Sequence, residues 1–198
     1  MSKEAAHMGE AARKLVTLAE YLAAEETSDT KHEFLNGETF AMAGGTLEHA
    51  RLQGNVYHEL RNRLGDRRCS VFPSDARVRV EATGLSTYPD VSVVCGPLER
   101  HPEDKNSFVN PTVLVEVLSE STEAYDRGSK FHHYRQIPSL QEYVLVSSHR
   151  RHVEVFRRNP DGSWTLRDTK DKGAAELTSI GCKLSLDEVY RDVFEESA

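Results

Sequence analysis

The spacing of hydrophobic residues changes several times along the chain, and each change predicts a different element. Between Thr46 and Gly65, apolar residues return at every fourth position, as they do on the buried face of an α-helix. The apolar stripe consists of Leu52, Val56, Leu60 and Leu64. Thr46 can cap the start of this helix and Gly65 can end it, so we predict a helix between them.

The preceding segment predicts a short helix and a β-hairpin. Thr17 and Glu20 have the spacing of a capping box, which indicates a helix from Leu18 to about Glu25. Residues 31–42 are centred on Asn36-Gly37, a dipeptide that readily adopts the two positive φ angles of a type I′ turn. The residues on either side of this turn are therefore expected to pair as antiparallel strands.

The middle of the chain predicts three strands. Residues 76–81 alternate small or apolar with charged side chains, as a half-buried strand does. Residues 90–94 and 112–118 are rich in β-branched residues, and the second run is apolar enough for a central strand buried on both faces. Residues 96–111 contain proline, aspartate and asparagine, and we expect them to form a loop.

The C-terminal part predicts a helix, three strands and a last small helix. The first helix should run from about Asp126 to Gln136, because the Ile137-Pro138 step disfavours its continuation. The later elements are strands at 142–146, 152–157 and 163–167 and a helix at 184–194. This order of elements indicates an α/β (α+β) fold, a mixed β-sheet flanked by helices.

The length of the chain suits one domain. A chain of 198 residues can bury one substantial core, and we place that domain at residues 17–198, after a flexible tail of residues 1–16. The tail lacks the apolar run of a signal peptide, and no window approaches the roughly 20 apolar residues of a membrane helix. We expect a soluble protein without a membrane partner.

Charge and cysteine content narrow the classes of function. A net charge of −7 argues against a protein that coats nucleic acid non-specifically, because such binding depends on phosphate neutralisation. Residues 61–79 nevertheless hold six arginines against two aspartates, and residues 127–158 hold seven basic residues against two glutamates. Either region could face nucleic acid or be an ordinary solvated surface. Cys69, Cys95 and Cys182 form no Cys-x-x-Cys pair, which indicates reduced thiols in a cytoplasmic protein.

Two acidic residues lie in otherwise hydrophobic strands: Asp90 begins one and Glu116 lies within the next. If these strands pair in antiparallel fashion, both carboxylates come to the same end of the sheet. Two buried carboxylates need a compensating cation, a basic side chain or protonation. Oxygen-only ligation suits Mg²⁺ or Mn²⁺. The alternatives are a salt-bridged structural pair and an accidental edge position.

Several motifs resemble known nucleases. Tyr88-Pro89-Asp90, followed by Glu116-Val117-Leu118, resembles the PD-(D/E)XK signature, in which two acidic residues hold the metal and a lysine assists. From about Thr17 to Tyr190 the chain resembles the Uma-two family of restriction-endonuclease-like proteins. The shared features are Val115 to Ser119, Lys130, Tyr134, Glu142-Tyr143, the hairpin from Lys31 to Glu38, and His49. The resemblance implies a restriction-endonuclease-like core.

One position departs from the superfamily pattern, because Leu118 stands where a lysine is usual. The resemblance implies that Lys130, on the following helix, replaces it. The alternative is an exposed lysine that pairs with Asp126 four residues before it. Tyr134 lies one helical turn further on and could hydrogen-bond within the site or simply pack in the core.

Other polar residues are weaker candidates. The resemblance suggests that Glu33 faces the same cleft, and an exposed hairpin charge is the alternative. His49 points inward with the apolar stripe of its helix, where a core residue is the more common outcome. Asp75 favours a turn over a supporting role in the site. The two histidine clusters, His132-His133 and His149 to His152, lack zinc-site spacing, and we interpret both as surface.

These residues lead to the hypothesis of metal-dependent phosphodiester hydrolysis. Asp90, Glu116 and the Val117 carbonyl would hold Mg²⁺ or Mn²⁺, and Lys130 would orient the attacking water or stabilise charge on the phosphate. The resemblance favours DNA over RNA as the nucleic acid, and a homodimer is compatible with the sequence. The alternatives are a nucleic-acid-binding accessory module with little or no turnover and a hydrolase of a small phosphorylated molecule.

Overall fold

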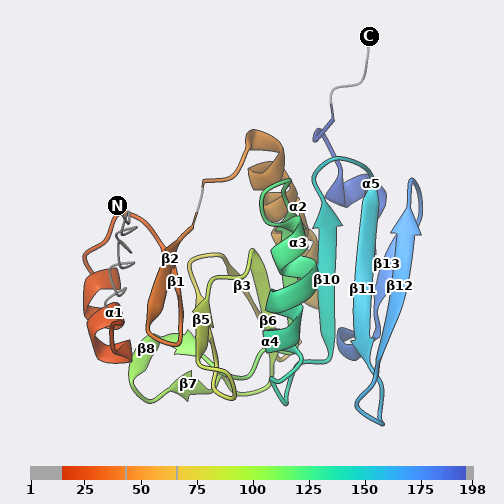
Figure 1. Cartoon of the computed structure of the whole chain (residues 1–198). Coiled ribbons are helices and arrows are strands. Elements are labelled where there is room, and N and C mark those ends of the chain that lie inside the picture. The colour runs from red at the N-terminus through yellow and green to blue at the C-terminus, as the bar shows by residue number, and fades with distance from the viewer. Residues whose placement is uncertain (1–14, 43, 66, 195–198) are drawn as a thin grey trace, which may run out of the picture.

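Two six-stranded β-sheets form most of the structure, a computed structural model that describes residues 15–42, 44–65 and 67–194. The first sheet has the strand order β2-β1-β5-β4-β8-β7 and the second β12-β11-β10-β9-β6-β3 (Figure 1). A small antiparallel pair, β13-β14, completes the strands. The fold is mixed α+β, as predicted, but its strands are divided between two large sheets where the sequence suggested one.

The first sheet contains the N-terminal hairpin and the strands around it. Its members are β1 (His32–Leu35), β2 (Glu38–Ala41), β4 (Arg77–Val80), β5 (Leu85–Thr87), β7 (Arg100–His101) and β8 (Asp104–Phe108). Asn36 and Gly37 adopt φ angles of 52° and 88°, which confirms the predicted turn between β1 and β2. Strand β5 is too short to give a periodic signal, and β7 and β8 form a hairpin within the segment expected to be a loop.

The second sheet contains the strands that carry the predicted acidic residues. Its members are β3 (Cys69–Pro73), β6 (Val91–Cys95), β9 (Val113–Leu118), β10 (Glu142–Ser147), β11 (His152–Arg158) and β12 (Trp164–Lys170). Strands β9 and β10 are parallel, and the other neighbours are antiparallel. The predicted strands of this region are confirmed, and β3 was not predicted.

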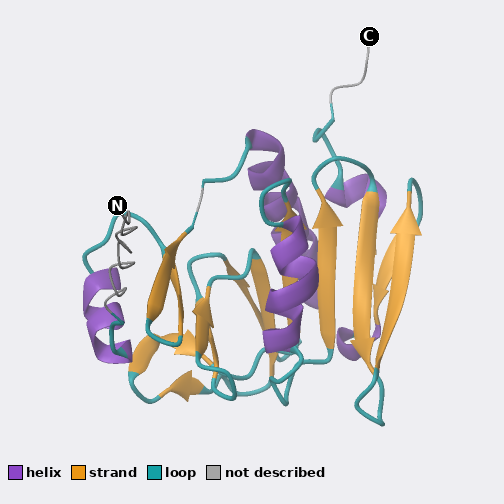
Figure 2. Ribbon diagram, viewed as in Figure 1, coloured by secondary structure: helices purple, strands orange, loops and turns teal. Residues whose placement is uncertain are grey.

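Helices cover the faces of the sheets (Figure 2). The helical segments are α1 (Leu18–Glu25), α2 (Leu47–Leu64), α3 (Glu123–Tyr125), the π-helix η1 (Asp126–Lys130), α4 (Phe131–Tyr134), the 3₁₀ turn η2 (Thr178–Ile180) and α5 (Leu186–Val189). The Thr17 capping box and the Thr46 cap are both present. The last predicted helix is wrong in extent, because β13 (Ala174–Leu177) and β14 (Cys182–Ser185) form a hairpin before a single helical turn.

Strand β9 is buried on both faces, and its two faces contact different cores. Val113, Val115 and Val117 pack in the cluster that contains the apolar stripe of α2. Leu114 and Leu118 pack in the other cluster, together with Tyr134 from α4. Because side chains alternate along a strand, Glu116 points to the same face as Leu114 and Leu118, towards the segment α3–η1–α4.

The cysteines differ from the prediction. Cys69 and Cys95 are directly opposite one another on β3 and β6 and form a disulfide, with their Cα atoms 4.0 Å apart. Cys182 is a buried free thiol. The expectation of three reduced cysteines was wrong because β3 was not predicted, so nothing in the sequence placed residues 69 and 95 next to each other.

The ends of the chain are only partly described. Residues 1–14 of the predicted flexible tail, and residues 195–198, lie outside the described residues. The Val16 N–H donates to the Gly37 carbonyl at 2.8 Å, so the last residue of the predicted tail contacts the β1–β2 turn. None of the described helices is long and apolar enough to cross a membrane.

Candidate active site

Asp90 and Glu116 lie at the same end of the second sheet. Strands β6 and β9 are antiparallel with Val91 opposite Val115, so the next pair in this register is Asp90 and Glu116. Oδ2 of Asp90 accepts the backbone N–H of Val117 at 2.7 Å, which fixes the carboxylate against β9. The antiparallel pairing that the sequence argument took as its condition is present.

Lys130 reaches this end of the sheet from the helical segment. Its ammonium lies 3.2 Å from Oε1 of Glu116, 3.2 Å from Oδ1 of Asp126 and 3.3 Å from Oε1 of Glu33. Only 5% of Lys130 is exposed. The alternative of an exposed lysine is therefore wrong, although its pairing with Asp126 is present.

Tyr134 is both packed and hydrogen-bonded. The residue is fully buried, and its hydroxyl donates to Oε1 of Glu116 at 2.7 Å. The two alternatives considered for this residue are thus both realised. Lys130 and Tyr134 are four residues apart and contact the same carboxylate oxygen of Glu116.

The turn that carries Lys130 is a π-helix. Residues 126–130 form η1 between α3 and α4, and Asp126 is buried at its start. Single π-helical turns are rare and occur often at functional sites. Asp126 entered the sequence argument only as a surface partner of Lys130, and its burial could not be read from its helical spacing.

Glu33 joins the cluster from the other sheet. It lies on β1, is buried, and accepts hydrogen bonds from the hydroxyls of Thr87 and Tyr125, the latter at 3.1 Å. The expectation of a charge facing the cleft agrees with this position, and the exposed alternative does not. Thr87 was missed because its strand, β5, was not predicted.

His49 contacts the site from α2. Its Nε2 lies 3.3 Å from Oδ2 of Asp90, and the Gln53 amide one turn later donates to the Asp90 carbonyl at 3.0 Å. The hydrogen bond with Asp90 raises the pKa of His49, and a hydrogen bond with the Val117 backbone adds to this effect. His49 is therefore a partner of the candidate site, where the sequence favoured a core residue.

A cleft of about 1240 Å³ opens over these residues. Its lining includes seven acidic side chains, Asp29, Glu33, Glu48, Asp90, Glu116, Glu120 and Asp126, and two lysines, Lys31 and Lys130. No described arginine lines it. The arginines of the two basic regions make other contacts: Arg67, for example, donates to the Ile180 carbonyl, and Arg157 pairs with buried Glu142. Of the arginines and lysines in these two regions, Lys130 is the one that lines the cleft.

Comparison with known proteins identifies the family. Residues 18–187 match the model of the Uma2 family, described as "Putative restriction endonuclease". The chain belongs to the Uma2 family. Two relatives from Synechocystis sp. are named uncharacterized proteins: slr1290 is 38% identical over 172 residues (87% of this chain, 90% of the relative), and sll1609 is 35% identical over 164 residues (83% and 93%).

A solved structure shares the fold of this Uma2 chain. It is the crystal structure of a protein from Anabaena variabilis described as "a putative nuclease belonging to DUF820". The TM-score is 0.69 at 16% sequence identity, over 84% of this chain and 93% of the other. The match shows a common fold, and the resemblance to restriction-endonuclease-like proteins predicted from the sequence is confirmed at the level of the family.

The acidic residues of the Uma2 cleft suit a divalent cation. Burial raises the pKa of Glu116 to about 8, and Asp126 and Asp90 add to this shift, whereas Lys130 and Tyr134 oppose it. Burial alone would lower the pKa of Lys130, but Glu116, Glu33 and Asp126 together raise it well above its usual range. The positive charge of Lys130 is thus shared among three buried carboxylates. Lys130 and Tyr134 both contact Oε1 of Glu116. Carboxylate oxygens are hard ligands of the kind that Mg²⁺ and Mn²⁺ prefer.

The protein ligands available to such an ion are few. Among the residues that the structure describes, no three His, Cys, Asp or Glu side chains are grouped closely enough to hold a metal. Two carboxylates, from Asp90 and Glu116, and the Val117 carbonyl remain as the ligand set implied by the sequence. Mg²⁺ commonly keeps several water ligands and binds through one or two carboxylates, so this small set is compatible with it.

The remaining candidates lie outside the ion cluster, the group formed by Lys130 with Glu33, Glu116 and Asp126. Asp75 is an exposed turn residue that pairs with Lys31 at 2.6 Å, as the sequence favoured. His132 and His149 are exposed, as predicted. His152 is buried beneath the Tyr190 hydroxyl, which accepts its backbone N–H, so its prediction as a surface residue was wrong. The error arose because His152 shares a face of β11 with Glu154 and Phe156, and this face packs against Arg127 and Phe131 of the segment α3–η1–α4.

Proposed function

We propose that this Uma2 protein is a metal-dependent endonuclease that hydrolyses phosphodiester bonds, with DNA as the favoured substrate. Family membership supports a nuclease-like activity, and the chemistry of the cleft supports the finer assignment. The proposed machinery consists of Asp90, Glu116 and the Val117 carbonyl as metal ligands, with Lys130, Glu33 and Tyr134 around them.

One observation carries the proposal. The usual lysine position is Leu118, yet Lys130 places its ammonium 3.2 Å from Glu116, the second acidic residue of the signature. Burying a lysine with three carboxylates carries a large desolvation cost, which their mutual attraction has to offset. Strongly perturbed charged groups of this kind cluster at functional sites. Its position is the one that a relocated catalytic lysine requires.

Each residue has a distinct task in this proposal. A bound Mg²⁺ or Mn²⁺ would supply a water of lowered pKa and withdraw charge from the phosphate. Lys130 would donate a hydrogen bond to the attacking water or to a phosphate oxygen as charge develops there. Tyr134 and Glu33 would hold Lys130 and Glu116 in place through the contacts described above. His49 and Gln53 would hold Asp90.

A second candidate is a nucleic-acid-binding module with little turnover. It is favoured by the same Lys130 contacts, since an ammonium held by three carboxylates is less free to reach a substrate. A hydrolase of a small phosphorylated molecule is less well supported, because a cleft of about 1240 Å³ exceeds the roughly 300–1,000 Å³ of common small-ligand pockets. The proposed location in the cytoplasm rests on the proposed DNA substrate alone, because the Cys69–Cys95 disulfide removes the argument from reduced thiols.

The decisive experiment combines metal binding with cleavage. Mg²⁺ and Mn²⁺ binding would be measured by calorimetry, and hydrolysis with plasmid and single-stranded circular DNA, on wild type, Asp90→Ala and Lys130→Ala. Lys105→Ala is the matched control, because Lys105 is an exposed lysine paired with Glu26 away from the cleft. We expect Asp90→Ala to lose both metal and activity, and Lys130→Ala to lose cleavage by about 100-fold or more while binding metal.

The outcomes separate the candidates. Metal binding without cleavage by wild type would favour the binding module. If the cleavage activity of Lys130→Ala is as high as that of Lys105→Ala, the role assigned to Lys130 is wrong. Absence of metal binding would overturn the assignment of Asp90 and Glu116.

A further inference from the structure

The rim of the cleft carries exposed aromatic side chains. Phe40 is 42% exposed and Phe194 is 36% exposed, and both line the cleft. Phe40 comes from β2, and Phe194 follows α5 and stacks on Tyr190. In Figure 1, α2 lies between β2, which carries Phe40, and α5, which precedes Phe194.

Phe40 stands next to the ion cluster. It is directly opposite Glu33 in the β1–β2 hairpin, and opposite residues of an antiparallel pair point to the same face. Glu33 is buried against Lys130, whereas Phe40 is left open. Met42 lies two residues further along the same face and also lines the cleft. Phe40 and Met42 therefore form an apolar surface beside the ion cluster.

The charge of the cleft disfavours binding through phosphates. Seven acidic side chains and two lysines line it. Lys31 pairs with Asp75, and Lys130 is held by three carboxylates. Proteins that bind a duplex rely on arginine and lysine contacts to the phosphates of both strands. No described arginine lines this cleft, so it lacks most of these contacts. Even one bound divalent cation would leave the lining negative.

We propose that the cleft recognises the unpaired bases of a single nucleic acid strand, which stack on Phe40 and Phe194 while one phosphate lies at Asp90, Glu116 and Lys130. The proposal rests on the proposed nuclease function and names its substrate class. Every base has a π-face, and stacking on an aromatic side chain contributes about 10-fold to 100-fold in affinity for each stacked base. Bases within a duplex cannot offer these faces.

The test compares single and double strands on the whole protein. Binding of a fluorescent 20-nucleotide single-stranded DNA, its duplex and the matching RNA would be followed by anisotropy, with Ca²⁺ in place of Mg²⁺ to prevent cutting. We expect the single strands to bind at least about 10-fold more tightly than the duplex. The affinity should also depend weakly on salt, because few phosphates are contacted. The DNA and RNA arms distinguish the two sources of unpaired bases.

Variants of Phe40 test whether the preference for single strands depends on its aromatic ring. Phe40→Ala should weaken single-strand binding about 10-fold, and Phe40→Tyr should restore it because it keeps the aromatic face. Leu166→Ala is the matched control, since Leu166 is a 48% exposed hydrophobic residue on β12 outside the cleft. Phe40 is exposed, so its truncation should leave the fold intact, which a thermal melt would check.

The results separate this inference from the proposed function. Tighter binding of the duplex, or equal effects of Phe40→Ala and Leu166→Ala, would overturn the single-strand inference even if the protein cuts DNA. Single-strand binding that depends on Phe40 without any cleavage would uphold it and refute the nuclease proposal. Metal calorimetry on Phe40→Ala should match wild type, because Phe40 is not among the proposed ligands.

Discussion

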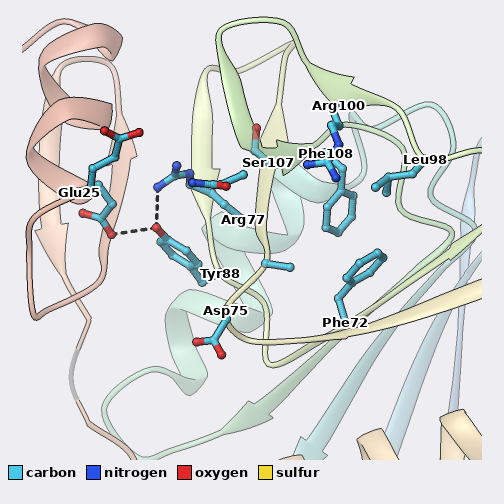
Figure 3. A pocket seen from close by; sticks show the side chains of 12 residues that line it. Glu25, Phe72, Asp75, Arg77, Tyr88, Leu98, Arg100, Ser107 and Phe108 are labelled. Carbon is cyan, nitrogen blue, oxygen red and sulfur yellow. Dashed lines mark hydrogen bonds between the residues drawn. The ribbon is translucent and has the colours of Figure 1, made fainter.

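Two of the buried charge clusters in the described part of the chain are built differently. The first is centred on Arg77, whose Nε and Nη2 donate to the two carboxylate oxygens of Asp104 at 2.6 and 2.9 Å. Its Nη1 donates to the Tyr88 hydroxyl, which donates to Glu25 (Figure 3). The second is centred on Lys130, whose ammonium contacts three carboxylates through one oxygen of each.

The protonation equilibria of the two clusters shift in opposite directions. Burial raises the pKa of Asp104, but its hydrogen bonds with Arg77 outweigh burial and lower it below the usual value. Burial raises the pKa of Glu116, and Lys130 does not compensate. The bidentate pair of Arg77 and Asp104 supplies two strong, directional hydrogen bonds. Buried carboxylates with strongly perturbed pKa values, such as Glu116, cluster at functional sites.

Tyr88 belongs to both regions. It lines the cleft of the candidate site and also a separate pocket of about 330 Å³ beside Arg77, Phe72 and Phe108 (Figure 3). Asp90 follows Tyr88 by two residues. The Arg77 network therefore supports the backbone that leads into the candidate site, which makes it a structural partner of that site.

The largest effect is expected at Asp104. Asp104→Asn would break the bidentate pair and leave the buried Arg77 charge poorly compensated, so unfolding free energy should fall by about 3 kcal/mol. Chemical denaturation measures this change. A loss below about 1 kcal/mol would show that the Arg77 network is not the structural support described above.

The same pair predicts a pH dependence. Since the pKa of Asp104 is lowered in the folded protein, its stabilising contribution is complete above its ordinary value of about 4 and is lost as pH falls through the folded-state pKa. The stability difference between wild type and Asp104→Asn should therefore shrink on going from pH 7 to pH 3. A difference that stays constant would contradict the ion-pair explanation.

A smaller effect of opposite sign is expected in the cluster around Lys130. Glu116→Gln, studied with a chelator, removes one of several crowded carboxylates and should leave stability unchanged or raise it by about 1 kcal/mol, while metal binding is lost. Glu142→Gln is the matched control: Glu142 is also a buried strand glutamate, but it pairs with Arg157 and accepts hydrogen bonds from Thr178 and Ser179. If both variants lose stability equally, the two kinds of cluster do not differ as described.

The smallest effect is expected for Tyr134→Phe. The change removes one hydrogen bond to Glu116 but keeps the packed ring and the Lys130 contact, so stability should fall by about 1 kcal/mol. Cleavage should fall by a few fold, far less than in Lys130→Ala. A loss of activity as large as that of Lys130→Ala would place Tyr134 at the reacting atoms.

Local signals predicted the elements that have strong periodicity or a defined turn. The α2 stripe, the Asn36-Gly37 hairpin and the strands that carry Asp90 and Glu116 all follow from their own sequence. The missed elements are short or polar. Strand β8, for example, reads Asp-Lys-Asn-Ser-Phe, and its pairing with β4 rather than its composition makes it a strand.

The sequence by itself determined that one acidic residue begins a strand and that the other lies within the next, because β-branched runs and the period of two are local properties of the chain. The antiparallel pairing that brings both to one end of the sheet is a long-range property. Only the tertiary structure decided which residues share that place. Glu33, Lys130 and His49 come from β1, η1 and α2, and they meet Asp90 and Glu116 only through the packing of two sheets and two helical segments. The same holds for the Cys69–Cys95 disulfide and for the Arg77 network, since burial and long-range pairing depend on contacts between distant segments that no local pattern encodes.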